Sequence, residues 1–132
     1  MSSKPTVLFI CAHNAGRSQM AAGYLQQLAG DRIEVLSAGP EPSKELNPVA
    51  VAAMAEEGID IAGNQPKALT TGAVQAADVV VTMNLEEECP YFPGKRYEDW
   101  VLVDPTGQGI EALRPVREEI RSRIVTLIDS LV

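Results

Sequence analysis

The stretch VLFICAHNAGRSQM, residues 7–20, decides how this chain folds. It begins inside a continuous apolar run, Thr6–Ile10, of the kind found in strands that are buried on both faces of a sheet. From Arg17 onward the apolar residues recur at helical spacing instead, on a stripe made up of Met20, Tyr24 and Leu28. The sequence therefore predicts a buried strand, a short loop and a helix that Gly30 ends.

Strands and helices alternate along the rest of the chain. Further strands are expected at 32–36, at 77–82 and within 97–103. Helices are expected from Pro48, with Asn47 as N-cap, to about Glu57, from Thr70 or Thr71, and over 110–131. The apolar face of the last helix is made up of Ile120, Ile124, Leu127, Ile128 and Leu131. This order predicts an α/β fold with a four-stranded parallel sheet, flanked by helices on both faces, in a single domain over 1–132.

The acidic composition limits the classes of partner. The 132 residues carry a formal net charge of −7, which disfavours nucleic acid because phosphate backbones need a basic face. No apolar run approaches the ~20 residues that span a bilayer, and the start does not read as a signal peptide. We therefore expect a cytoplasmic protein that binds neither nucleic acid nor a membrane. A single histidine and two distant cysteines argue against a metal site.

The loop after the first strand has the composition of an anion-binding nest. Ligands of open parallel sheets bind beyond the carboxyl ends of the strands, where this loop is expected to lie. Inward N–H groups and a helix start attract negative charge, and Arg17 offers a planar fork to two oxygens. Small residues let the backbone wrap closely, and Asn14 can adopt a left-handed conformation and bond the backbone. The predicted oxyanion-binding residues are Ala12, His13, Asn14, Ala15, Gly16 and Arg17. His13 either lines the mouth of the site or is a solvated loop residue, and it is assigned no catalytic role. A plain turn residue is the alternative for Asn14.

The cysteine that ends the first strand is a candidate nucleophile. The helix start, Arg17 and a hydrogen bond from Ser18 all favour the thiolate form of Cys11. A thiolate inside an oxyanion cradle is aimed at its substrate. A buried cysteine followed by an ordinary loop is the alternative, but the spacing C-x5-R-S at a strand-to-helix turn is much more specific than a lone cysteine.

A proton donor is also needed, because an oxygen must leave the attacked centre. The segment VLVDPTGQG places Asp104 after the fourth predicted strand, at the same sheet edge as Cys11. Asp-Pro is also a common turn. The acid role of Asp104 therefore depends on the cysteine loop at the same edge.

Three segments together resemble the thiol-dependent arsenate reductases built on the low-molecular-weight tyrosine phosphatase fold. They are CAHNAGRSQMAAGYL, SAGPEPSKELNPVAVAAMAEEGIDI and CPYFPGKRYEDWVLVDPTG. The continuation Ser18-Gln19-Met20-Ala21 favours the reductases, since phosphatases of this fold usually have proline after the serine. Phosphatases also tend to carry two tyrosines after the acid Asp-Pro, where Thr106 and Gly107 stand here.

The resemblance implies a role for each matching residue. Cys11 resembles the nucleophile, Arg17 the oxyanion clamp and Ser18 the hydrogen-bond partner of the thiolate. Asn14 resembles the residue that organises the loop, and Asp104 the general acid. Family chemistry then implies that Cys11 attacks arsenate and that water leaves. A second thiol attacks the arsenic adduct, and arsenic departs in the trivalent state.

The sequence differs from some members of the family in the cysteines that would supply the second thiol. Thioredoxin-coupled members carry two further cysteines, but here Leu85 stands in one of those places and Cys89 alone remains. Either Cys89 attacks Cys11 directly, or a small external thiol does so. The segment PGKRYEDW resembles the mycothiol- and mycoredoxin-coupled members, and glutathione with a glutaredoxin-like redoxin is the other option. A packed or vestigial residue without a redox role is the alternative for Cys89. The resemblance implies no bound cofactor.

Two rival functions use the same residues. A low-molecular-weight protein tyrosine phosphatase would use Cys11, Arg17 and Asp104 on a phosphate ester, and weak phosphatase activity is expected of a reductase too. A non-enzymatic oxyanion-binding domain would not need the acid at 104. Some relatives hold potassium with a glutamate where this chain has Ala22, so no strong cation site is expected.

Overall fold

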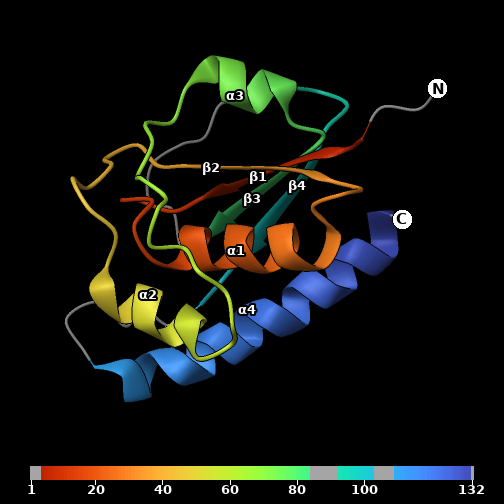
Figure 1. Cartoon of the computed structure of the whole chain (residues 1–132). Coiled ribbons are helices and arrows are strands. Elements are labelled where there is room, and N and C mark those ends of the chain that lie inside the picture. The colour runs from red at the N-terminus through yellow and green to blue at the C-terminus, as the bar shows by residue number, and fades with distance from the viewer. Residues whose placement is uncertain (1–3, 84–91, 103–108, 132) are drawn as a thin grey trace.

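The computed structural model describes residues 4–83, 92–102 and 109–131. Four strands of this part of the chain form one parallel sheet in the order β2-β1-β3-β4 (Figure 1). Their bounds are β1 Thr6–Ile10, β2 Glu34–Ala38, β3 Val79–Met83 and β4 Arg96–Trp100. The predicted α/β class and four-stranded parallel sheet are confirmed.

The described helices cover both faces of the sheet. α1 spans Arg17–Ala29, α2 Pro48–Ala55, α3 Thr71–Ala76 and α4 Ile110–Leu131. Figure 1 shows α3 on one side of the sheet and α1, α2 and α4 on the other. Among the described residues, no helix combines the length and the apolar character that crossing a bilayer requires.

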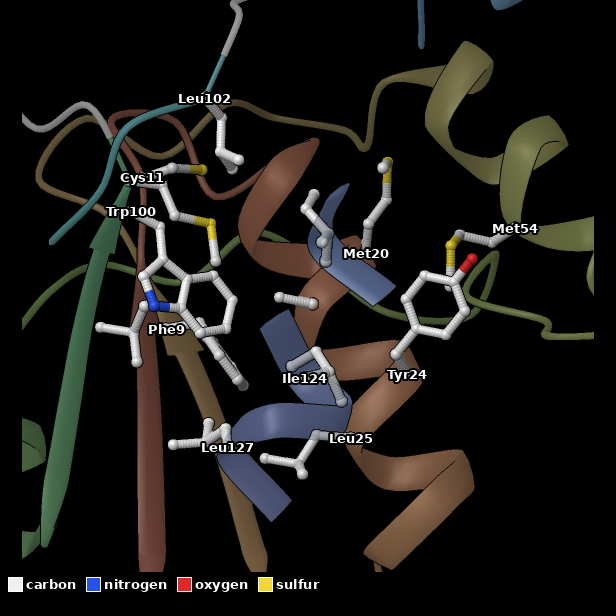
Figure 2. Packing of buried hydrophobic residues seen from close by; sticks show 14 of the residues in the cluster. Phe9, Cys11, Met20, Tyr24, Leu25, Met54, Trp100, Leu102, Ile124 and Leu127 are labelled. Carbon is white, nitrogen blue, oxygen red and sulfur yellow. The ribbon is translucent and has the colours of Figure 1, made fainter. Parts of the chain in front are cut away.

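The two central strands are buried on both faces, as their apolar runs predict. Side chains alternate along β1, so that Val7 and Phe9 join one core cluster while Leu8 and Ile10 join the other. The larger cluster lies between the sheet and α1, α2 and α4, and Figure 2 shows part of it. The smaller cluster lies under α3 and includes Val74. Burial on both faces explains why β1 reads as an unbroken apolar run.

Strand β2 begins two residues later than the sequence predicts. The N–H groups of Arg32 and Ile33 both donate to the carbonyl of Ala29, at 2.9 Å, and so continue the turn after α1. Pairing with β1 begins only where Glu34 meets Thr6. Residues 32 and 33 can either continue the turn after α1 or extend β2. Backbone hydrogen bonds to the preceding helix decide between the two, and the pattern of apolar residues does not indicate them.

The stripe predicted for α1 is wrong at one position. Met20 and Tyr24 are buried, but Leu28 is 44% exposed. A spacing of four residues drifts by about 40° at each step around a helix of 3.6 residues per turn. The stripe therefore returns to the core through Leu25 and Ala29, which are fully buried. On α4 the predicted face is confirmed, with Ile120, Ile124 and Leu127 buried and Ile128 and Leu131 packed against the core.

Candidate active site

Cys11 lies at the carboxyl edge of the sheet, directly after β1. Its side chain is 4% exposed and belongs to the larger core cluster. Figure 2 shows it at the end of the cluster that Leu102 also occupies. The chain leaves β1 toward β2 on one side, while β3 and β4 continue the sheet on the other. This is the point where the strand order reverses, and open α/β sheets bind their ligands there.

Three backbone carbonyl groups of the loop 12–16 are directed at the segment 41–47 that follows β2. The carbonyls of Ala12, His13 and Ala15 accept hydrogen bonds from the N–H groups of Glu41, Ser43 and Asn47, at 2.9, 3.0 and 2.9 Å. A planar trans peptide directs its N–H opposite to its C=O. The next N–H in each case, on His13, Asn14 and Gly16, therefore points to the inner side of the loop. The segment that follows β2 thus builds a cradle of inward donors.

Asn14 organises this loop from its interior. It is fully buried and has a φ of 50°, the left-handed conformation expected from the sequence. Its Oδ1 accepts the backbone N–H of Lys67 at 2.8 Å, and its Nδ2 donates to Ser18 Oγ at 2.8 Å. One side chain therefore ties the loop both to a distant segment and to the first turn of α1.

Ser18 presents a hydroxyl to the candidate nucleophile. The distance between Ser18 Oγ and Cys11 Sγ is 2.9 Å, and both side chains are buried. Because Ser18 Oγ already accepts a hydrogen bond from Asn14, its own hydrogen is left to donate to sulfur. A hydrogen bond donated to sulfur stabilises a thiolate more than a thiol. The contact thus places a hydrogen-bond donor directly on the sulfur that the sequence predicts to be the nucleophile.

The start of α1 adds further attraction for an anion. Gly16 is the N-cap and supplies no side-chain hydrogen bond to the first turn, which carries no acidic residue. The unpaired N–H groups of a helix start carry partial positive charge. Arg17 occupies the first helical position beside them. A bound oxyanion would therefore complete the cap that no side chain of α1 provides.

A pocket of about 340 Å³ opens over Cys11. Its loop side is formed by His13, Ala15, Gly16 and Arg17. The lining also includes Pro48 at the start of α2, Leu113 on α4, and Glu45. Five of the six residues predicted to bind the oxyanion therefore line the pocket or organise it, while Ala12 contributes its backbone.

His13 lines the pocket with an exposed side chain and is held by a backbone contact. Its Nδ1 is 2.9 Å from the carbonyl oxygen of Glu41, and the side chain is exposed. A carbonyl only accepts, so Nδ1 carries the proton in this contact. The remaining ring nitrogen faces away from this bond and is an acceptor in the neutral ring. Nothing in this arrangement places His13 on the Cys11 sulfur.

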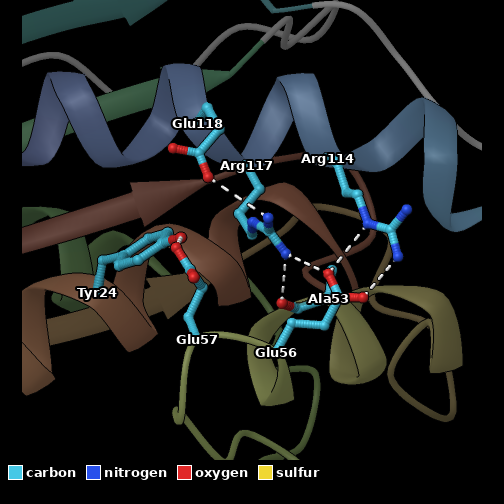
Figure 3. A network of polar contacts seen from close by, with 7 residues as sticks. All are labelled: Tyr24, Ala53, Glu56, Glu57, Arg114, Arg117 and Glu118. Carbon is cyan, nitrogen blue, oxygen red and sulfur yellow. Dashed lines mark hydrogen bonds and ion pairs between the residues drawn. The ribbon is translucent and has the colours of Figure 1, made fainter.

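The wall of the pocket is braced by a polar network that joins α1, α2 and α4 (Figure 3). Arg114 donates twice to the carboxylate of Glu56, at 3.1 and 2.6 Å, and Arg117 donates to the same carboxylate at 2.7 Å. The bonds from Arg114 and then Arg117 lower the pKa of Glu56 from 4.5 to about 2. Burial, followed by the bond to Glu57, raises the pKa of Tyr24 above its usual value. The network fixes the two helices that carry Pro48 and Leu113.

Two residues that shape the loop were missed by sequence reasoning. Gly39 follows β2, and a Cβ there would lie 2.3 Å from the carbonyl oxygen of Cys11 and 2.7 Å from that of Ala12. Gln19 is buried under the loop and bonds Asn14. The glycine in SAGP was a usable signal for close backbone approach. The partners of Gln19 are far away in sequence, so no local pattern indicates them.

The remaining predicted site residues, Asp104 and Cys89, lie outside the described residues. Ala22 lines a separate pocket of about 510 Å³, together with Gln19 and Lys67. Within 4–83, 92–102 and 109–131, no group of three His, Cys, Asp or Glu side chains is placed to hold a metal ion.

A model of the family described as low molecular weight phosphotyrosine protein phosphatase matches residues 6–132. The chain belongs to this family. Within it, the chain is 38% identical over 127 residues to the "Glutaredoxin arsenate reductase" of Synechocystis, covering 92% of this chain and 95% of that protein. It is also 38% identical over 126 residues to "Arsenate reductase 1" of Staphylococcus epidermidis, covering 93% and 95%. These values place the chain among the arsenate reductases of the family.

Solved structures of the same family share the fold. A Corynebacterium glutamicum protein titled a thioredoxin-dependent arsenate reductase superposes with a TM-score of 0.87 at 42% identity, over 98% of this chain and 63% of that one. This chain thus spans less than two thirds of the Corynebacterium chain. An arsenate reductase titled as being in the phosphate-binding state has a TM-score of 0.86 at 35% identity, over 97% and 99%. A tyrosine phosphatase from T. tengcongensis has a TM-score of 0.81 at 26% identity, over 97% of this chain and 100% of that one.

Proposed function

We propose that this enzyme reduces arsenate to arsenite through a covalent adduct on Cys11. The observation that carries the proposal is the chain of contacts from Asn14 through Ser18 to Cys11 Sγ beneath a pocket of inward N–H groups. A poised thiolate beneath an oxyanion cradle fits nucleophilic attack on a tetrahedral oxyanion. The similarity to proteins named arsenate reductases supports arsenate as that oxyanion.

The first step forms the sulfur–arsenic bond. The Cys11 thiolate attacks arsenic while the cradle and Arg17 hold the oxygens, and one oxygen leaves as water. Asp104 supplies a proton to that oxygen, because an unprotonated oxygen is a poor leaving group. Arsenic is still pentavalent in the adduct, so no electrons have yet been transferred.

The second step transfers the electrons. An external thiolate attacks the Cys11 sulfur, the electron pair of the sulfur–arsenic bond passes to arsenic, and arsenite leaves. The two sulfurs remain as a mixed disulfide, which a redoxin then reduces. We propose mycothiol and a mycoredoxin for these roles, with glutathione and a glutaredoxin-like redoxin as the alternative.

The charge of the pocket lining supports an uncharged thiol. The exposed Glu45 lines the pocket, and the chain as a whole carries a formal net charge of −7. Both charges disfavour a thiol with a net negative charge, such as glutathione, unless local donors offset them as the loop N–H groups and Arg17 do for arsenate. The names of the relatives mention glutaredoxin and thioredoxin, and these are the competing reductants to test.

The deciding experiment is an arsenate-dependent turnover assay with separate reducing systems. Purified enzyme is supplied with mycothiol and mycoredoxin, with glutathione and glutaredoxin, or with thioredoxin and its reductase. We expect turnover mainly in the first mixture and none in any mixture with Cys11→Ser, because a hydroxyl is a far weaker nucleophile than a thiolate. Turnover in Cys11→Ser would remove Cys11 from the mechanism.

Phosphatase activity is the second candidate, since the matching family model is that of a phosphatase. The cradle fits phosphate as well as arsenate, so slow hydrolysis of p-nitrophenyl phosphate is expected. Fast hydrolysis that arsenate merely inhibits, without arsenite formation, would make the chain a phosphatase.

A further inference from the structure

Gln19 lies between the oxyanion loop and a segment far away in the chain. Its side chain is on the first turn of α1 and is 2% exposed. Its Nε2 donates to the carbonyl oxygen of Asn14 at 3.1 Å, to Asn14 Oδ1 at 3.2 Å and to the carbonyl oxygen of Gln65 at 3.3 Å. Its Oε1 accepts from Asn64 Nδ2 at 3.4 Å. A buried carboxamide is thus satisfied on both ends, with most of its donation directed at Asn14.

These bonds determine which end of the Asn14 side-chain amide is the oxygen and which is the nitrogen. The backbone N–H of Lys67 can only donate, and it contacts the same atom of Asn14 as Gln19 does. That atom must therefore be the oxygen, which leaves the Asn14 NH₂ group to face Ser18. Ser18 Oγ then accepts from Asn14, and its hydrogen is directed to Cys11 Sγ. The donors at Asn14 Oδ1 thus fix the direction of the Asn14–Ser18 bond, and with Cys11 as a thiolate only Ser18 can donate between Ser18 Oγ and Cys11 Sγ.

Gln19 also holds the backbone of the loop. Its bond to the Asn14 carbonyl lies at the one non-glycine residue of the described chain with positive φ. Such a conformation persists only where its surroundings hold it. Loss of the Gln19 amide would remove the bond to the Asn14 carbonyl and one of the two donors to Asn14 Oδ1, leaving the side chain to Lys67 and Ser18.

We propose that Gln19 is a positioning residue that keeps Asn14 oriented so that Ser18 donates to the Cys11 sulfur. This inference rests on the proposed role of Cys11 as nucleophile, but it does not depend on arsenate being the substrate. Gln19 touches no reacting atom. It acts on reactivity through Asn14 and Ser18.

The test compares how fast iodoacetamide alkylates Cys11 across a range of pH, with the labelled residue identified by mass spectrometry. Gln19→Glu keeps the shape but points carboxylate oxygens at the two oxygens of Asn14, and Gln19→Leu removes the bonds. In both variants we expect alkylation of Cys11 at neutral pH to slow about tenfold, the effect of losing one net hydrogen bond, and its pH profile to move to higher pH. Gln27→Leu, an exposed position on the same helix, is the matched control and is expected to behave as wild type.

A double-mutant cycle separates positioning from general loosening of the fold. If Gln19 acts through Ser18, Gln19→Glu changes alkylation little when Ser18 is already alanine. A full additional tenfold loss in the Ser18→Ala background would overturn the proposal, as would wild-type profiles in folded Gln19→Glu and Gln19→Leu. Thermal unfolding, monitored by circular dichroism, shows which variants are folded. One folded variant at Gln19 is enough for the test. Wild-type arsenate turnover tests the proposed function separately, since alkylation needs no substrate.

Discussion

Ser18 Oγ lies 2.9 Å from Cys11 Sγ, across the loop that joins β1 to α1. The two residues stand at opposite ends of that loop, so the distance is set by the conformation of everything between them. The carbonyl bonds to the segment 41–47 and the left-handed Asn14 close the loop into a ring. The length of this hydrogen bond therefore depends on the conformation of the whole loop. The same bond would also stabilise a thiolate at Cys11.

Removing this hydroxyl should lower the reactivity of Cys11. We expect Ser18→Ala to slow iodoacetamide alkylation at neutral pH by about 10- to 100-fold, since a hydrogen bond to a charged group is worth about 1.5–3 kcal/mol. Ser43→Ala, which alters an exposed serine lining the same pocket, is the control. Equal rates in Ser18→Ala and Ser43→Ala would show that the hydroxyl does not stabilise the thiolate.

Gly39 is predicted to tolerate no side chain. In Gly39→Ala the new Cβ would meet two backbone carbonyl oxygens of the Cys11 loop, and backbone cannot give way as a flexible side chain can. Overpacking of this kind typically costs about 1–3 kcal/mol of unfolding free energy, measurable by urea denaturation. Gly63→Ala is the matched control, because nothing lies within 4 Å of a Cβ there. Wild-type stability and Cys11 alkylation in Gly39→Ala would show that the contact relaxes freely.

The Glu56 network predicts a stability loss in acid. The pKa of Glu56 is lowered to about 2 in the folded protein from 4.5, so its stabilising contribution is complete above pH 4.5 and disappears as the pH falls toward 2. Partial exposure and solvent screening moderate the effect. We expect Glu56→Gln to lower the urea midpoint at pH 7 and to differ less from wild type at pH 3. Asp129→Asn, at an exposed position of α4, controls for the loss of a charge.

Asp104→Asn should slow the first chemical step while leaving oxyanion binding intact. The amide cannot donate the proton that the leaving oxygen needs, and general acid catalysis contributes about 10²–10⁴-fold. The measurement is single-turnover formation of the Cys11–arsenic adduct, followed by rapid quench and mass spectrometry. Arsenate protection of Cys11 against alkylation reports binding and should persist. Adduct formation at the wild-type rate would exclude Asp104 as the acid.

Local sequence patterns were enough to predict the parts of the fold that local forces decide. The bounds of β1 and the face of α4 follow from apolar periodicity, and the position of Cys11 follows from the end of an apolar run. The contacts that shape the site are different in kind. Gln19 meets Gln65 across 46 positions of sequence, and Asn14 meets Lys67 across 53. Such pairs depend on how the elements pack, and a single sequence does not encode them in any periodicity.

The last prediction concerns how the catalytic cycle closes. The family resemblance leads us to expect a relay thiol where Leu85 stands, so we propose that oxidation does not pass from Cys11 to Cys89 by that route. Direct bonding would need the two Cα atoms to come within about 7 Å. Cys89 also follows the acidic run Glu86-Glu87-Glu88, and like charges disfavour a second thiolate there. A small thiol entering from solvent meets neither obstacle.

We therefore expect Cys89→Ser to keep most of its arsenate turnover when a low-molecular-weight thiol and its redoxin are supplied, and thioredoxin alone to support little. Cys11→Ser, assayed in parallel, is the inactive reference. The mixed disulfide between Cys11 and the small thiol should be trapped by mass spectrometry when the redoxin is left out. Loss of all activity in Cys89→Ser, together with a trapped Cys11–Cys89 disulfide in wild type, would instead establish an internal two-cysteine mechanism.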